Sequence, residues 1–181
     1  DVYKRQISAG LEEGLPNNAI KKGIREYSGV GRRYEKHLLK IESKQIILID
    51  DYGHHPTEIE SNINAYKEEF PNKKVCMIFQ PHRFSRTAQL FDDFINTLKR
   101  TDLLILLDIY PASEKPIKGI NSMIIKETLK QNGHKDVIYV DNHNDINNII
   151  FKKKDAFDIL VTQGAGSISI VCESLKNKWM N

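Results

Sequence analysis

Short apolar segments alternate with longer stretches of helical apolar spacing from residue 46 to residue 178. The segments with strand character are 46–50, 75–79, 103–109, 137–140 and 158–162. The stretches with helical spacing are 57–70, 85–99, 122–132, 144–153 and 167–178. Strands that are apolar throughout, each followed by an amphipathic helix, are typical of a parallel sheet covered on both faces. The repeat is too short for an eightfold barrel, so we predict an α/β fold with a Rossmann-like, doubly wound, mostly parallel sheet.

The residues before this alternation predict three further features, namely a hairpin, a helix and a linker. Segment 34–41 and the first apolar segment flank a polar turn at 42–45, which predicts an antiparallel hairpin at the start of the sheet. A helix is predicted over 19–27, and Ser28-Gly29-Val30-Gly31 after it predicts a linker, because two glycines in three residues loosen the backbone. The sequence begins at Asp1 rather than Met, so we expect the chain to be part of something longer.

Polar residues at the helix boundaries predict how three helices begin. Thr57 and Glu60 have the spacing of a capping box. Ser122 is suited to open helix 122–132 and Gly133 to close it, and Ser167 is able to cap the last helix.

Composition excludes several classes of protein. The 27 basic and 24 acidic residues alternate, whereas a nucleic-acid binder concentrates Lys and Arg on one face. The basic run Lys152–Lys154 ends a predicted helix, where cations are favoured. The longest aliphatic run, Leu103–Leu107, is far shorter than the ~20 residues of a membrane span. Isolated Cys76 and Cys172, with no export signal, favour buried thiols in a reducing compartment. We therefore predict a soluble, cytoplasmic protein with no nucleic-acid or membrane partner.

Polar side chains gather in the segments that follow the predicted strands. Ligands of open parallel sheets bind beyond the carboxyl ends of the strands. The segments at those ends are Asp50–Pro56, Gln80–Arg86, Asp108–Ala112 and Gln163–Ser167. Three of the six histidines lie in the first two of these segments, so we expect them to line one edge of the sheet.

Three interpretations of His54-His55 and the preceding Asp50-Asp51 stay open at this point. Imidazole and carboxylate ligands suit zinc or manganese, which would make the chain a metal-dependent hydrolase. A histidine can instead bond a carbonyl or cap the following helix. The pair can also present donors to an anionic substrate.

His82, Arg83 and Arg86 predict an anion site. Cations at a helix start oppose the macrodipole, so two arginines and a histidine there suggest a bound anion. The alternative is that the arginines pair with Asp92 or Asp93. The glycine-rich segment 163–166 and the pair Arg32-Arg33 are weaker signals, because each suits either a ligand phosphate or an ordinary turn or surface. No phosphate-loop motif and no nucleophile elbow occurs in the sequence.

Four motifs together resemble the C-terminal domain of the Mur ligase family. They are Asp50–Glu58, Phe79–Thr87, Asp108–Ala112 and Val161–Gly166, in family order, and the resemblance covers residues 28–178. The first motif is most similar to that of the members that add L-alanine, since other members share only a looser Asp-Tyr-x-His version.

The resemblance implies an ATP-dependent ligation for peptidoglycan synthesis. The carboxylate of UDP-N-acetylmuramate would be phosphorylated to an acyl phosphate, which the amine of L-alanine would attack. Residues 1–30 would be the tail of a central ATPase domain and residues 31–181 the C-terminal domain. The N-terminal and central domains, which would hold most of the Mg²⁺ contacts, would be missing, so the chain alone would be inactive.

Site residues follow from the matched positions. Arg33 would contact the nucleotide phosphates and Asp51 the ribose. Tyr52 and His54 would bind substrate. Arg83, Arg86 and His82 would be catalytic, and no metal ligand is expected. Ser167 and Ser169 depart from the usual Asn and Gly of the family, and Asp1–Gln6 match it poorly. A stand-alone hydrolase and a non-enzymatic binding module are the alternative functions.

Overall fold

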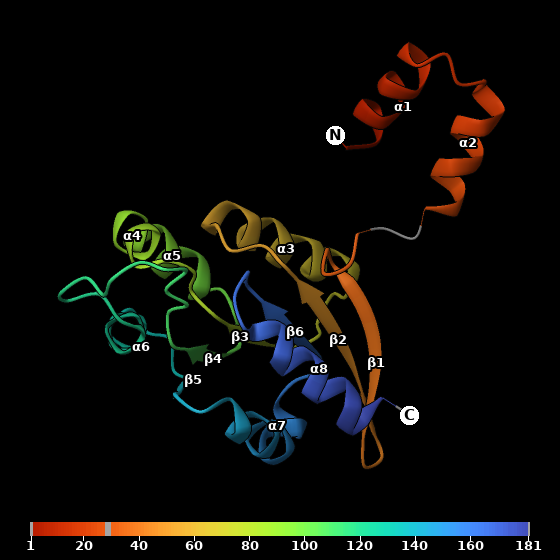
Figure 1. The fold of residues 1–181 in the computed structure, drawn as a ribbon. Helices are drawn as coiled ribbons and strands as arrows, with labels where there is room; N and C mark the ends of the chain where they lie inside the picture. Colours follow the sequence, from red (N-terminus) through yellow and green to blue (C-terminus); the bar gives the residue numbers. More distant parts are fainter. Residues whose placement is uncertain (1, 28–29, 181) are drawn as a thin grey trace. The chain divides into compact units, whose positions relative to one another are not determined.

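The chain forms two compact units in a computed structural model that describes residues 2–27 and 30–180 (Figure 1). The boundary between the units in the sequence falls between Gly31 and Arg32. The first unit is a pair of helices, α1 (Val2–Glu12) and α2 (Asn17–Glu26), so the predicted helix at 19–27 is confirmed. Ser28 and Gly29 of the predicted linker lie outside the described residues.

The second unit is built on a six-stranded sheet. Its strands are β1 (Glu35–Ile41), β2 (Lys44–Asp51), β3 (Val75–Phe79), β4 (Leu103–Leu107), β5 (Val137–Val140) and β6 (Ile159–Gln163). The order across the sheet is β1-β2-β6-β3-β4-β5, with only the β1–β2 pair antiparallel. The predicted parallel sheet with an initial hairpin is confirmed. The hairpin turn is shorter than predicted, because Glu42 takes a positive φ of 55° and β2 begins at Lys44.

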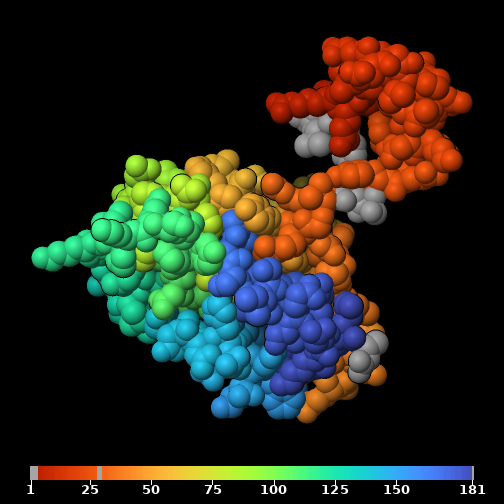
Figure 2. Space-filling view, in the orientation of Figure 1, coloured from red at the N-terminus to blue at the C-terminus, as the bar shows by residue number. Residues whose placement is uncertain are grey.

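Helices cover both faces of the sheet. The first face carries α3 (Pro56–Glu69), α5 (Phe91–Leu98) and α6 (Ser122–Gln131), and the second carries α7 (Ile146–Lys153) and α8 (Ile168–Trp179). The chain moves outward from β2 to β5 and then returns to place β6 between β2 and β3. Successive strand residues feed two separate cores, as Met77 packs with the first set of helices and Cys76 with the second. Figure 2 shows α8, in blue, covering the face turned to the reader.

The predicted helix 85–99 is wrong, since two helices occupy this segment. The first is α4 (Phe84–Gln89) and the second is α5, with Leu90 between them at φ −112° and ψ 26°. The apolar spacing that suggested one helix belongs to α5, which buries Phe94, Ile95 and Leu98. In α4 only Thr87 is buried, so no apolar face holds it in line with α5.

The predicted helix caps are also wrong in three places. The capping box of α3 is His55 and Glu58, because Pro56 occupies the first helical position and moves the start of the helix. Asn121 caps α6 by accepting from the Ile124 amide, while the Ser122 hydroxyl donates to the Leu107 carbonyl. Ser167 makes no cap bond of its own, since its hydroxyl lies against the Gln80 amide.

Both cysteines are buried in the core, as predicted. Burial raises the pKa of Cys76, and it raises the pKa of Cys172 to about 12. Among the described residues no helix is both long and apolar enough to cross a membrane.

Candidate functional site

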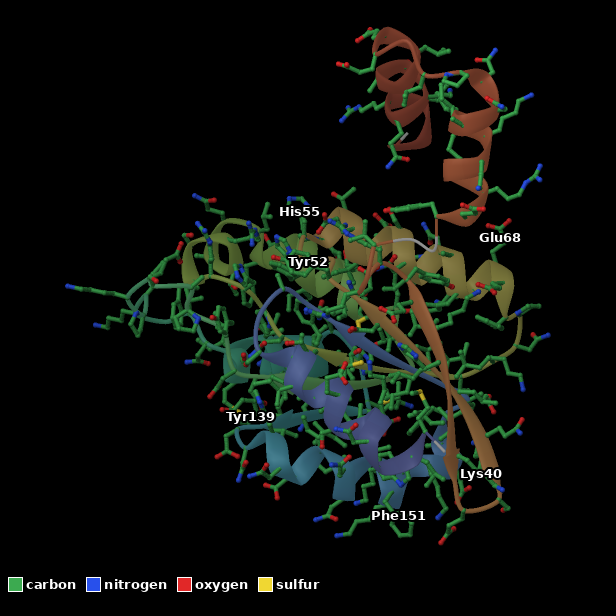
Figure 3. The ribbon with its side chains drawn as sticks, turned by 45° about the vertical axis from the view of Figure 1, so that its right-hand side comes forward. Lys40, Tyr52, His55, Glu68, Tyr139 and Phe151 are labelled. Carbon is green, nitrogen blue, oxygen red and sulfur yellow. The ribbon has the colours of Figure 1, made fainter. Side chains whose placement is uncertain are left out.

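Four loops meet at the carboxyl edge of the sheet. They follow β2, β6, β3 and β4, which are neighbours in that order. In Figure 3 the labelled Tyr52 and His55 lie beyond the carboxyl end of β2, whereas Lys40 lies near the hairpin at the opposite end. The loop between β4 and α6 is the longest of the four and projects at the left of Figure 2.

Backbone hydrogen bonds join the loops after β3 and β4. Tyr110 donates its amide to the Pro81 carbonyl at 2.8 Å, and its carbonyl accepts the Arg83 amide at 2.8 Å. His82 and Tyr110 thereby form an isolated parallel bridge beyond the two strands. These bonds fix the two loops relative to each other.

Four aromatic rings from three loops form a continuous row, which we call the ring row. It consists of Tyr52, His54, His82 and Tyr110, whose successive ring centroids lie 5.5, 5.3 and 5.4 Å apart. The His82 and Tyr110 planes are stacked at 17°. The row brings the Tyr52–His54 turn against the His82–Arg86 turn, so the predicted meeting of these two turns is confirmed.

Two arginines extend the site beyond His82. The Arg86 Nη1 lies 3.3 Å from the His82 Nδ1 and donates to the His82 carbonyl at 3.2 Å. The Arg83 guanidinium is half exposed, and its Nη1 lies 3.9 Å from a Glu114 carboxylate oxygen. The predicted alternative partners, Asp92 and Asp93, form no ion pair with either arginine among the described residues.

His82 is held as a neutral imidazole. Burial lowers its pKa, and the neighbouring His54, Arg86 and Arg83 side chains lower it further. Because a guanidinium only donates, the Nδ1 facing Arg86 must be the acceptor, which leaves the proton on Nε2. The site therefore combines fixed guanidinium charge with a neutral ring that can still donate.

Backbone strain is present at Arg83. Its φ of 74° lies in the left-handed region of backbone conformation, which residues other than glycine and asparagine rarely adopt. The Tyr110 carbonyl holds the Arg83 amide in this conformation, and the Arg83 carbonyl accepts the Thr87 hydroxyl at 2.8 Å. Strain of this kind is common where a loop presents a functional side chain.

Asp51 organises the loop that carries Tyr52 and His54. Its Oδ1 accepts from the Gly53 amide at 2.7 Å and from the Gln163 side chain at 2.9 Å, and its Oδ2 accepts from the Tyr34 amide at 2.8 Å. The carboxylate is only 6% exposed. Its observed bonds are structural, and the ribose contact expected from the sequence stays a prediction.

The adjacent arginines Arg32 and Arg33 have different surroundings. Arg32 pairs with buried Asp50 at 2.9 Å and donates to the Gly164 carbonyl at 2.8 Å, so it ties the ends of β2 and β6 together. Arg33 is exposed, with its guanidinium carbon 5.7 Å from the Tyr52 ring centre. Only Arg33 is free to approach a phosphate, which is the role predicted for it.

The geometry does not support the metal-site interpretation of His54-His55. His55 accepts from the Thr57 amide as a helix cap, while His54 belongs to the ring row. Asp50 and Asp51 are occupied by the bonds described above. In the part of the chain that the structure describes, no group of three metal-ligating side chains is found.

The glycines after β6 allow close packing of loops. A side chain at Gly166 would lie 2.5 Å from the Gln80 Oε1 and 2.6 Å from the Tyr110 Cγ. The Gln80 Oε1 also accepts the Ile168 amide at 2.9 Å, so Gln80 performs the capping that was predicted for Ser167. The tight-turn interpretation of this segment is the one its contacts support.

Sequence reasoning missed Tyr110 and Glu114 as site residues. Tyr110 was visible as the aromatic residue in Asp108–Ala112, directly after a strand. Glu114 gave no local signal, because its partners Ser85 and Arg83 are about thirty positions away in the sequence.

Glu114 supports the start of α4, and its contribution should depend on pH. Its carboxylate accepts the Ser85 amide at 2.9 Å and the Ser85 hydroxyl at 2.7 Å, and these bonds lower its pKa. A lowered pKa in the folded state gives stability that is complete above the unfolded pKa of about 4.3 and is lost as the pH falls through the folded value. Glu114→Gln should therefore destabilise the chain at pH 7, with a difference that shrinks below about pH 4.

Urea unfolding of the parent chain and of Glu114→Gln, at pH 7 and below about pH 4, measures the difference in the free energy of unfolding. Glu127→Gln on α6 is the matched control, since the one polar contact of the Glu127 carboxylate with other described residues is a 4.0 Å pair with Lys126. A Glu114→Gln difference that is the same at both pH values would contradict the assigned bonds.

The fold and the loop sequences define the class of protein. Residues 32–166 match the family described as "Mur ligase, glutamate ligase domain", so the chain belongs to the Mur ligase family. It is 39% identical over 170 residues to a UDP-N-acetylmuramate–L-alanine ligase of Psychrobacter cryohalolentis, and 36% identical over 173 residues to one of Hydrogenovibrio crunogenus. These matches cover 93% and 95% of the chain but only 35% and 38% of the relatives' lengths.

Solved structures agree on the fold. A UDP-N-acetylmuramate-alanine ligase from Thermotoga maritima superposes with a TM-score of 0.70 at 24% identity, covering 95% of this chain and 35% of that one. A folylpolyglutamate synthase from the same organism gives a TM-score of 0.57 at 18% identity, over 92% of this chain and 35% of that one.

Proposed function

We propose that the chain supplies the amino-acid-binding part of an ATP-dependent ligase that joins L-alanine to UDP-N-acetylmuramate in the cytoplasm. The ring row with Arg83 and Arg86 carries this proposal, because it gathers imidazole and guanidinium groups at the ligand-binding edge of the sheet. The relatives named for this reaction add support for L-alanine as the amino acid. Residues 1–30 belong to a preceding ATPase domain in this proposal, and the rest of the ligase lies outside the chain.

The site residues have distinct roles in the proposed reaction. Arg83 and Arg86 bind the carboxylate of L-alanine and the charge that develops on the acyl phosphate. Tyr52 and His54 line the amino-acid pocket, and His82 donates a hydrogen bond from its Nε2–H. The catalytic effect is positioning and charge stabilisation rather than covalent chemistry by this chain.

ATP and Mg²⁺ contacts are shared with the rest of the ligase. Arg33 is the residue of this chain that fits the phosphates of ATP, because its guanidinium is exposed beside the Tyr52 ring. Bound Mg²⁺ supplies charge neutralisation at the transferred phosphoryl group, and in this proposal it is held mainly by the central domain.

A hybrid ligase tests the proposal. It is the Psychrobacter cryohalolentis relative in which this chain replaces the matching 170 residues. We expect phosphate release that requires ATP, UDP-N-acetylmuramate and L-alanine together. Phosphate release that requires a different amino acid would contradict the proposal. A hybrid that folds but releases no phosphate would also contradict it. Titrating L-alanine into the 181-residue chain by NMR is the second test, with shifts expected at Tyr52, His54 and His82.

A further inference from the structure

Contacts from two sides hold Tyr110, the last residue of the ring row. Its backbone is bonded to the loop after β3, as described above. Its side chain lies close to Gly166, where an added side-chain carbon would come within 2.6 Å of the Tyr110 Cγ and 2.7 Å of its Cβ. The Tyr110 ring also stacks on His82 at 17°. Tyr110 is therefore held between the loop after β6 and the imidazole of the site.

This position determines the orientation of His82. An imidazole can rotate about its terminal torsion, which is broad, so an outside contact must choose its plane. Stacking on Tyr110 sets the plane of the His82 ring. The plane in turn fixes where the Nδ1 meets the Arg86 guanidinium and where the Nε2 points.

We propose that Tyr110 is a positioning residue of this site, which orients His82 and through it Arg86 for binding the amino-acid carboxylate. The inference rests on the proposed function for the identity of the ligand, but the contacts that carry it are internal to the chain. The Tyr110 hydroxyl is not needed for this role, because the stacked face of the ring makes the contact. Gly166 is required because it leaves room for that ring.

The test compares Tyr110→Leu with Tyr110→Phe in the 181-residue chain. Leucine fills similar space without a stacking face, whereas phenylalanine keeps the face. We expect Tyr110→Leu to raise the midpoint of the His82 Hε1 titration in NMR, because the His82 ring becomes more exposed to water. We also expect it to shift the Arg86 side-chain resonances. Tyr110→Phe should leave both unchanged. A purely structural role would lower the melting temperature of Tyr110→Leu without moving the His82 titration.

L-Alanine binding gives the second readout. We expect Tyr110→Leu to weaken it by about 10- to 100-fold, the size expected for the loss of a hydrogen bond between charged partners, and Tyr110→Phe to retain it. Gly166→Ala should act in the same direction as Tyr110→Leu, and it replaces that variant if leucine prevents folding. Its methyl group would come within 2.6 Å of the Tyr110 Cγ as well as 2.5 Å of the Gln80 Oε1.

The outcomes separate the two proposals. If the His82 titration moves but L-alanine does not bind the parent chain, Tyr110 positions His82 and the proposed amino acid is wrong. If L-alanine binds but the His82 titration is the same in Tyr110→Leu, Tyr110→Phe and the parent chain, the positioning role of Tyr110 is overturned.

Discussion

Arg83→Ala is expected to lower kcat/KM for L-alanine in the hybrid ligase by about 30- to 150-fold. The Arg83 guanidinium is half exposed, and its only ion pair in the described chain is the 3.9 Å contact with Glu114. It is therefore available to a ligand carboxylate. Losing a hydrogen bond between charged partners costs about 2–3 kcal/mol, which corresponds to this fold-change. Initial rates of phosphate release at varied L-alanine concentration measure it.

Two controls make the Arg83 result specific. Arg83→Lys keeps the charge but not the two-pronged geometry, so it should recover only part of the activity. Arg100→Ala removes a guanidinium that pairs with Glu60 on α3 at 2.7 Å, and it should leave kcat/KM unchanged. Equal losses in Arg83→Ala and Arg100→Ala would show that charge or stability, rather than the site, is responsible.

The sequence predicted the sheet because the pattern behind it is local. Each inner strand carries a continuous apolar run, and each amphipathic helix shows its own buried face, so fold class follows from periodicity alone. The placement of β6 between β2 and β3 was not predictable in this way. It depends on which face the return connection covers, and no single segment encodes that choice.

The rule for strand ends explains how much of the site could be predicted. His54, His82 and Arg86 all follow strands, and parallel strands bring their carboxyl ends to one edge, so their meeting was predictable. The roles of Arg32 and Arg33 could not be told apart from residue type and spacing, because the two residues are adjacent and chemically identical, and only the family resemblance assigned the phosphates to Arg33. Only the folded chain shows that Arg32 is committed to Asp50 while Arg33 stays exposed.

The predicted helix starts were wrong for a physical reason that applies beyond this chain. Thr57 and Glu60 have suitable residue types, but Pro56 sets the first helical position and makes His55 the cap. The choice between competing caps depends on backbone geometry that residue type alone does not fix.

Asp51→Ala is expected to lower the free energy of unfolding by about 3–5 kcal/mol. The buried carboxylate accepts from the Gly53 amide, the Gln163 side chain and the Tyr34 amide. Alanine would leave the Gly53 and Tyr34 amides without this acceptor and the Gln163 side chain with the Gly53 carbonyl alone. Each buried unsatisfied group costs about 1–3 kcal/mol. Gln163 is fully buried, so water has poor access to replace the lost oxygen.

Urea unfolding at pH 7 measures the Asp51→Ala loss, and the chain offers a close control. Asp108 also follows a strand, but it is exposed, and within residues 2–27 and 30–180 it accepts only from the Tyr139 hydroxyl, at 2.7 Å. Asp108→Ala should therefore cost no more than about 1 kcal/mol. If the two variants lose similar amounts, the bonds to Asp51 do not stabilise the chain. In that event the ribose contact predicted for the Asp51 carboxylate would be favoured over a structural role.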